Sequence, residues 1–316
     1  MLAWLGRSSS VNAGVGVMLL ALILGLWLTE STFATSDNVV NLLEANASLL
    51  IVAVGLTFVM LARGFDLSLG GMLALTGVLV AQFLGSGFGI GFAITLALVF
   101  ALAGGLGLNG LLIAGVRLPF LVVTLGTASL FRGVALVLTD GTTKPLFDQP
   151  FLVSLGTERV LGVPWSVIIA FVVLVVAMLV LRYTGYGRMV YAVGGNEEAA
   201  RIAGIPVAAV RFSVYGIAAV LAGLAGILEA ARLTSAAPTA ATGIELTAAA
   251  AVLLGGTKFT GGRGAMLGTL LGVLFLGVLA NGITLAEIEA YWQSIVAGIV
   301  VIAALLLDRV ARGEPE

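Results

Sequence analysis

Residues 165–181 read Trp-Ser-Val-Ile-Ile-Ala-Phe-Val-Val-Leu-Val-Val-Ala-Met-Leu-Val-Leu, an apolar run that contains no charged side chain. A helix of roughly 20 such residues crosses the hydrocarbon core of a bilayer. Trp165 opens the run and Arg182 follows it, and these residue types are enriched where a span meets the membrane boundary. The stretch therefore predicts a transmembrane helix.

The composition of the whole chain agrees with this segment. Of the 316 residues, 60% are hydrophobic and 10% are charged, and the mean hydropathy is +1.17. A soluble domain of this length needs more charge to cover its surface. The 43 glycines suit close packing between membrane helices. The net charge of −1 gives no field for nucleic acid.

Other apolar runs resemble the first and predict an all-α polytopic bundle, a single transmembrane domain over residues 1–316 with about ten spans. Two runs are short and are expected to be tilted, broken or paired with the next span inside the protein; they cover residues 48–62 and 246–256. The full set is 12–28, 48–62, 67–84, 88–114, 118–138, 165–181, 212–231, 246–256, 265–283 and 292–307.

The basic residues predict the orientation, because Lys and Arg are retained on the cytoplasmic side. With ten spans and a cytoplasmic N-terminus, most of the 15 basic residues fall inside. The exceptions are Arg132, Lys144, Arg159 and Arg232. Both termini are therefore expected in the cytoplasm.

The absence of Cys and His limits the chemistry of the chain. Without a thiol or an imidazole, and with Lys144 and Lys258 in loops, an intramembrane hydrolase is disfavoured. Neither lysine belongs to a Gly-rich phosphate-binding loop that ends in Gly-Lys-Ser/Thr. An ion-coupled secondary transporter would place carboxylates near the midplane, and the predicted span centres offer almost none.

The predicted cytoplasmic loop, residues 182–211, contains helix signals over residues 196–206. Asn196 can cap the start, and Glu197 and Glu198 suit the positive end of the helix dipole. Gly204 can adopt the left-handed closing conformation, and Pro206 stops the helix. These signals predict a helix of about two turns, which is too short to be stable without tertiary contacts.

Two interpretations fit this short helix. With Ile202 and Ile205 beside charged residues, it could dock into a groove on a partner. Alternatively, it is a tight turn that packs on its own bundle.

Several segments, in order, resemble the membrane permease subunits of ABC importers for ribose and other monosaccharides, which are related to branched-chain amino acid permeases. The resemblance covers nearly the whole chain. The segments are Ala62-Arg-Gly-Phe-Asp-Leu-Ser-Leu-Gly70, Asn109-Gly110, Pro119-Phe-Leu-Val-Val-Thr-Leu-Gly-Thr127, Phe131-Arg132-Gly133, Gly187-Arg188, and Gly194-Gly195-Asn196 through Gly204-Ile205. Pro206 departs from the pattern, which more often has a polar residue there.

The resemblance implies a non-enzymatic permease of ten spans in the bacterial inner membrane. Its expected partners are a cytoplasmic ATPase subunit that uses ATP and Mg, a second permease copy or paralogue, and an external binding protein that delivers a sugar. This chain itself is expected to bind no cofactor, and polyols and branched-chain amino acids remain alternative substrates. The loop then resembles a coupling helix that docks on the ATPase, with these residues: Gly195, Asn196, Glu197, Glu198, Ala200, Arg201, Ile202, Gly204 and Ile205.

Arg132 is a basic residue well inside a predicted span, and such a residue is a functional candidate, although it could also snorkel outward. Glu229, at a comparable depth, is the most available partner, so an Arg132–Glu229 pair is one hypothesis. With the neighbouring Phe131, these residues are candidates for the translocation path.

Four further polar residues are candidates for this path. Asp66, with Ser68, either caps the third span, the favoured interpretation, or contributes to the path or its inner gate. Asn109 and Asn281 lie in or at the end of apolar runs, where an amide bonds across helices or meets a passing solute. Interhelical bonding is the favoured interpretation for both.

Overall fold

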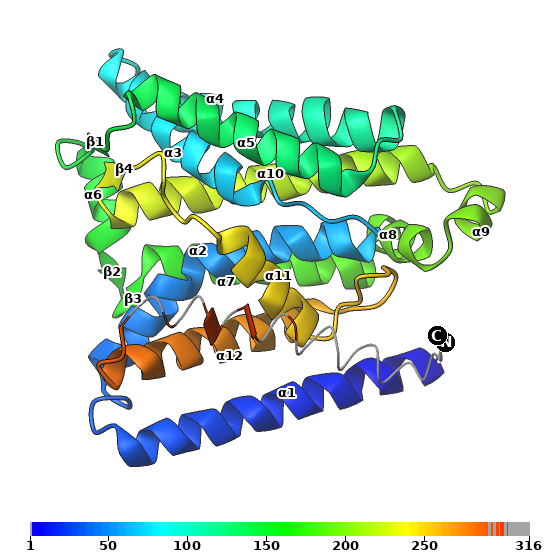
Figure 1. The fold of residues 1–316 in the computed structure, drawn as a ribbon, viewed down its shortest axis with the longest axis horizontal. Coiled ribbons are helices and arrows are strands. Elements are labelled where there is room, and N and C mark those ends of the chain that lie inside the picture. Colours follow the sequence, from blue (N-terminus) through cyan, green and yellow to red (C-terminus); the bar gives the residue numbers. More distant parts are fainter. Residues whose placement is uncertain (1, 290–291, 293–294, 297, 300–301, 303–316) are drawn as a thin grey trace.

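The computed structural model describes residues 2–289, 292, 295–296, 298–299 and 302, with side chains from residue 13 onward. It is a bundle of helices (Figure 1). In chain order the helices are α1 (Leu2–Thr29), α2 (Ser36–Leu61), α3 (Leu69–Gly85), α4 (Ile90–Gly104), the π-helix η1 (Gly105–Gly115), α5 (Phe120–Thr139), α6 (Pro150–Thr157), α7 (Trp165–Tyr183), α8 (Gly185–Gly195), α9 (Glu197–Ile202), α10 (Val207–Arg232), α11 (Ile244–Leu254) and α12 (Met266–Leu285).

Four two-residue strands lie in the connections. The strand β1 (Lys144–Pro145) pairs antiparallel with β4 (Ser235–Ala236), with Lys144 opposite Ala236. The strands β2 (Arg159–Val160) and β3 (Val163–Pro164) form a small hairpin. These strands join loops at one end of the bundle, so every long element within the described residues is a helix.

The helices α2 and α10 form the centre of the bundle, as Figure 1 shows. In each of these two helices, 72% of the most apolar 18-residue stretch is buried. Small residues let the two backbones approach, since a Cβ at Gly55 would lie 3.1 Å from Cα of Ala218. Close backbone packing of this kind holds helices together where no water drives association.

The helices at the periphery show the opposite pattern. In α4–η1, α5 and α7, only 22% to 28% of the corresponding 18-residue stretch is buried. Their outer faces carry large apolar side chains such as Phe92, Val122 and Phe171, each more than 40% exposed. Within the described residues, six helices are long and apolar enough to cross a membrane. The pattern fits an all-α membrane bundle whose outer helices face lipid.

The structure differs from the sequence-based expectation at residues 48–62. This run is the second half of α2, a continuous helix of 26 residues. The sequence misled because polar residues such as Asp37, Asn41 and Glu44 interrupt the apolar pattern in the first half of α2. The run at 246–256 does form a short helix, α11, of 11 residues. The predicted span at 292–307 lies largely outside the described residues.

The start of α11 meets the start of α3 inside the bundle. A Cβ at Gly70 would collide with the carboxylate of Glu245. Because α3 begins at Leu69 after an irregular connection, the ends of two short helices meet within the protein. Irregular backbone at this depth is tolerated where protein surrounds it.

Candidate functional site

The segment predicted as a coupling loop, residues 182–211, is almost entirely helical. It contains the end of α7, all of α8 and α9, and the start of α10. Figure 1 places α8 and α9 together at one end of the bundle, called here the α9 end. The sequence signals predicted α9 but not α8, because α8 is rich in Gly and carries no acidic residue in its first turn.

The capping residues of α9 act as the sequence predicts. The Asn196 Oδ1 atom accepts a hydrogen bond from the backbone N–H of Ala199 at 3.0 Å. Gly204 has a φ of 79°, a conformation that glycine adopts without steric cost. Because α9 has only six residues, contacts with the bundle must hold it in place.

Ion pairs clamp one face of α9. The Glu197 carboxylate binds Arg211 on α10 at 2.8 Å and Arg201 at 2.9 Å. Arg201 also binds Glu198 at 3.0 Å. Ala200 is buried against the bundle, whereas Ile202 on the outer face is 81% exposed. Thus α9 is fixed along its inner side and presents an exposed apolar residue outward.

The end of α8 packs directly on two other connections. A Cβ at Gly194 would collide with the carbonyl of Leu61, the last residue of α2, and Gly262 donates a hydrogen bond to that same carbonyl at 2.9 Å. The Tyr191 hydroxyl donates to the carbonyl of Gly264 at 3.0 Å. Burial raises the pKa of Tyr191 to about 12, so it remains a donor at neutral pH. The α8–α9 segment is therefore in contact with α2 and with the α11–α12 connection.

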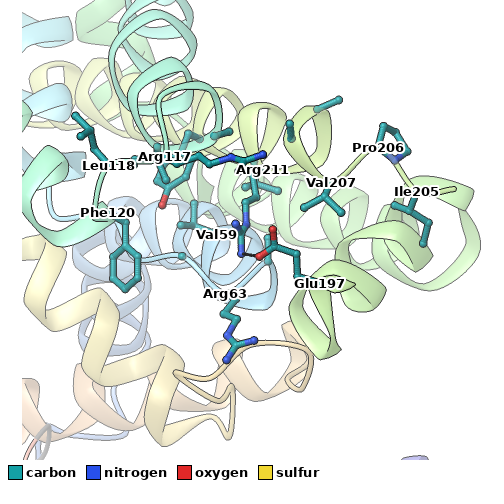
Figure 2. A pocket seen from close by; sticks show the side chains of 18 of the residues that line it. Val59, Arg63, Arg117, Leu118, Phe120, Glu197, Ile205, Pro206, Val207 and Arg211 are labelled. Atoms are coloured by element: carbon teal, nitrogen blue, oxygen red, sulfur yellow. Dashed lines mark ion pairs between the residues drawn. The ribbon is translucent and has the colours of Figure 1, made fainter. Parts of the chain in front are cut away.

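A cavity of about 860 Å³ lies beside α9. It is bounded by the end of α2, the end of η1, the start of α5 and the start of α10. Figure 2 shows the Arg211–Glu197 ion pair inside it, with Arg117 above and Arg63 below the pair in that view. The coupling-loop residues Arg201 and Ile205 also line it.

Asp66, Ser68 and Asn109 form one buried polar cluster with Thr127. The Asp66 carboxylate accepts bonds from the Ser68 N–H and hydroxyl at 2.8 and 2.6 Å. The Asn109 amide donates to Asp66 at 3.2 Å and to Ser68 at 2.8 Å, and Thr127 donates to Asn109 Oδ1 at 2.7 Å. The four side chains connect the α2–α3 connection, η1 and α5.

This cluster corrects the expectation for Asp66. Helix α3 begins at Leu69 with no side-chain cap, so the carboxylate binds the residue before the helix and not the free N–H groups of its first turn. Asp66 and Asn109 have no exposed surface, and Ser68 is 2% exposed. Fully hydrogen-bonded and buried, the three residues join helices in this conformation, and Asn109 bonds across helices as the sequence predicts.

The predicted interaction between Arg132 and Glu229 is wrong, because each residue has other partners in the structure. Glu229 accepts bonds from Arg232 at 2.6 Å and from Ser48 at 2.9 Å. Arg132 donates to the carbonyls of Pro238 and Ala240 at 3.0 and 3.1 Å. Comparable depth did not place the two residues on facing sides, and the irregular segment before α11 supplies the partners of Arg132.

Glu245, the residue before the predicted short span at 246–256, is the acidic residue near Arg132. The two interact electrostatically, and Glu245 Oε2 is buried without a hydrogen-bond partner among the described residues. Neighbouring Phe131 is buried and packs near Gly104 and Gly71. The signal that could have indicated that Glu245 lies inside the bundle is the shortness of the apolar helix that follows Gly243.

Asn281 forms a reciprocal amide pair with Asn38. Each side chain donates to the other, at 2.8 and 3.0 Å, across α12 and α2. The preference for interhelical bonding is confirmed here as well.

An all-α bundle of this kind, with a charge-clamped helix at one end, has the architecture of a membrane transport subunit. The chain belongs to the family described as branched-chain amino acid transport system / permease component, whose model matches residues 38–305.

Relatives of this chain include proteins named as ribose and allose permeases. The chain is 41% identical over 310 residues to the ribose import permease protein RbsC of Escherichia coli (strain K12), which covers 97% of this chain and 94% of the relative. It is 40% identical to RbsC of Bacillus subtilis (strain 168), over 96% of this chain and 94% of that relative. It is 34% identical to the D-allose transport system permease protein AlsC of Escherichia coli (strain K12), over 92% and 90%. No solved structure matches the chain significantly.

Proposed function

We propose that this chain is the membrane-spanning permease subunit of an ATP-driven importer and that it carries a monosaccharide, with ribose as the first candidate. The family match and the identity to ribose and allose permeases support this function. The chain is not itself an enzyme; ATP and Mg are used by a separate subunit. Branched-chain amino acids, which the family description names, and polyols are the alternative cargoes.

In this proposal the chain has ten spans in the bacterial inner membrane, with both termini in the cytoplasm. The α9 end is then cytoplasmic, because it gathers Arg182, Arg188, Arg201 and Arg211 within one connection. The exposed apolar faces of α4, α5 and α7 meet lipid or a second permease. An external protein delivers the sugar to the opposite end.

The observation that carries the coupling role is the construction of α9. Its inner side is fixed by Asn196, Glu197 and Ala200, while Ile202 is 81% exposed. A short helix held this firmly, with an apolar residue facing away from its own bundle, is suited to a groove on another protein. We assign Gly195, Glu198, Arg201, Gly204 and Ile205 to the same coupling element.

The path of the sugar is proposed to pass near Arg132 and Glu245. Both residues are only partly buried, and together they offer a guanidinium and a carboxylate beside the meeting ends of α3 and α11. Hydroxyl groups of a sugar can bond to both kinds of group. Six further residues are proposed to belong to the surroundings of this path, although other contacts hold their side chains in place. They are Phe131, Asp66, Ser68, Asn109, Glu229 and Asn281.

Uptake measurements test the cargo. The permease, reconstituted with its ATPase and its external binding protein, is expected to accumulate labelled ribose and to ignore labelled isoleucine and xylitol. Accumulation of isoleucine alone would assign the chain to amino acid import instead.

A matched pair of variants tests the coupling role. Ile202→Glu is expected to reach the membrane at normal levels but to lose both ribose uptake and co-purification of the ATPase. Leu161→Glu, at a fully exposed apolar residue of the β2–β3 turn at the opposite end of the bundle, is expected to retain co-purification of the ATPase. Normal uptake and ATPase binding by Ile202→Glu would remove α9 from the interface.

A further inference from the structure

The cavity beside α9 has an excess of positive charge. Four arginines line it, namely Arg63, Arg117, Arg201 and Arg211, and Glu197 is the acidic residue among its lining residues. Glu197 binds Arg201 and Arg211. Neither Arg63 nor Arg117 forms an ion pair with a described residue. Figure 2 shows the Arg117 guanidinium beside Arg211 and the Arg63 guanidinium directed away from the Arg211–Glu197 pair, so Arg117 is the unpaired guanidinium next to that pair that is available to an anion.

Arg63 and Arg117 share an uncommon backbone conformation. Their φ angles are 66° and 65°, in the left-handed region where a residue with a Cβ is disfavoured relative to glycine. Each lies two residues beyond the last residue of a helix, α2 for Arg63 and η1 for Arg117. The carboxyl end of a helix favours a nearby cation, but this preference provides no hydrogen-bond partner for the guanidinium groups.

We propose that this cavity binds a phosphate group, and that the ligand is a small phosphate ester. Guanidinium groups match the geometry of phosphate oxygens and bind them through paired charge-assisted hydrogen bonds. The volume of about 860 Å³ lies within the usual range for small-molecule pockets. Apolar residues such as Val59, Ile113 and Val214 line the rest of the cavity and leave room for the body of the ligand.

The same cavity is less suited to an acidic side chain of a docked protein. The residues of α9 that extend furthest from the bundle, Ile202 at 81% and the Glu198 side chain at 70% exposure, do not line the cavity. Most of the residues that do line it, such as Arg117 and Tyr215, belong to the bundle, and the coupling element contributes Glu197, Arg201 and Ile205. A partner seated on the outer face of α9, at Ile202, therefore contacts a different surface.

A bound phosphate has a consequence for α9. It competes with Glu197 for Arg211, because that guanidinium lines the cavity and carries the ion pair. Displacing the carboxylate releases the first turn of α9 from α10. The ligand thereby loosens the coupling element, so a cytoplasmic phosphate ester reduces import. This regulatory effect rests on the proposed function, whereas binding to the cavity does not.

Binding is tested with the full-length permease in nanodiscs of neutral phosphatidylcholine. The probes are ribose 5-phosphate, inorganic phosphate and free ribose, measured by thermophoresis. Ribose 5-phosphate is expected to bind with an affinity that falls as salt rises, and Arg117→Gln is expected to weaken it about tenfold or more. Arg117→Lys retains part of the binding. Arg188→Gln, which removes an exposed arginine at the α9 end outside the cavity, has no effect.

A second arm distinguishes a soluble ester from a lipid headgroup. Nanodiscs that contain phosphatidylglycerol are compared with neutral ones; stabilisation that Arg117→Gln abolishes assigns the phosphate to lipid and supports the phosphate site. The proposal is overturned if neither source depends on Arg117. It is also overturned if Arg117→Gln leaves both unchanged but weakens ATPase binding, since the cavity then belongs to the protein interface. Because the probes are read without transport, these results stand apart from a failure of the proposed import function.

Discussion

The Nη2 atom of Arg211 lies 2.8 Å from Oε2 of Glu197, while Nη2 of Arg201 lies 2.9 Å from Oε1 of the same carboxylate. One carboxylate thus joins the first turn of α9 both to α10 and to its own last turn. Glu198, its neighbour in sequence, binds only Arg201 among the ion pairs of the described residues. Two adjacent glutamates therefore have different structural roles.

Glu197→Gln is expected to loosen α9. Losing a partly exposed ion pair costs up to about 1 kcal/mol, so the amides of residues 199–205 are expected to exchange roughly two- to fivefold faster with deuterium, as mass spectrometry can measure. Glu198→Gln serves as the control and leaves exchange at the wild-type rate. Equal acceleration in the two variants would show that the link to Arg211 does not hold the helix.

Gly194→Ala is expected to destabilise the protein strongly. A Cβ there meets the carbonyl of Leu61, which is backbone and cannot rotate away, and overpacking of this kind costs about 1–3 kcal/mol. Gly195→Ala is the matched control, because no atom lies within 4 Å of a Cβ at that position. Melting in detergent should give a lower Tm for the first variant alone, and indistinguishable Tm values would contradict the close approach.

Asp66 and Asn109 are expected to be coupled energetically. In Asp66→Asn, an NH2 group replaces a carboxylate oxygen that accepts a hydrogen bond from Asn109. The Asn109 amide cannot simply turn over, because its Oδ1 accepts a hydrogen bond from Thr127. A double-mutant cycle with Asp66→Asn and Asn109→Ala, read from unfolding free energies, should give a coupling of about 0.5–3 kcal/mol. Strict additivity would mean that the cluster does not act as a unit.

A second cycle separates the two candidate partners of Glu229. The variants Glu229→Gln and Arg232→Gln are expected to be non-additive by about 0.5 kcal/mol or more, because their side chains are 2.6 Å apart. Glu229→Gln and Arg132→Gln are expected to be additive, since Arg132 bonds to backbone carbonyls. The reverse pattern would restore the pairing that the sequence suggested.

The local signals in the sequence predicted the features that depend on neighbouring residues. Asn196 and Gly204 define the ends of α9 through bonds and backbone angles within a few residues, so their types were sufficient. The length and hydropathy of residues 165–181 predicted α7 in the same way.

Features that depend on distant segments were harder to predict. The partner of Arg132 is the backbone of residues 238 and 240, which no residue type reveals. Glu245 looks like a loop residue until α11 is seen to begin inside the bundle. The polar first half of α2 is stabilised by tertiary bonds such as Asn38 to Asn281, so hydropathy underestimated that helix.

The buried Asp66 cluster also constrains how the chain is made. Its four members come from three segments, and Thr127 follows Asp66 by two further apolar helices. A ribosome delivers these segments to the membrane one after another, and a carboxylate that enters lipid before its partners arrive is strongly disfavoured. Holding the segments from Asp66 to Thr127 together until all four side chains are present would avoid that cost.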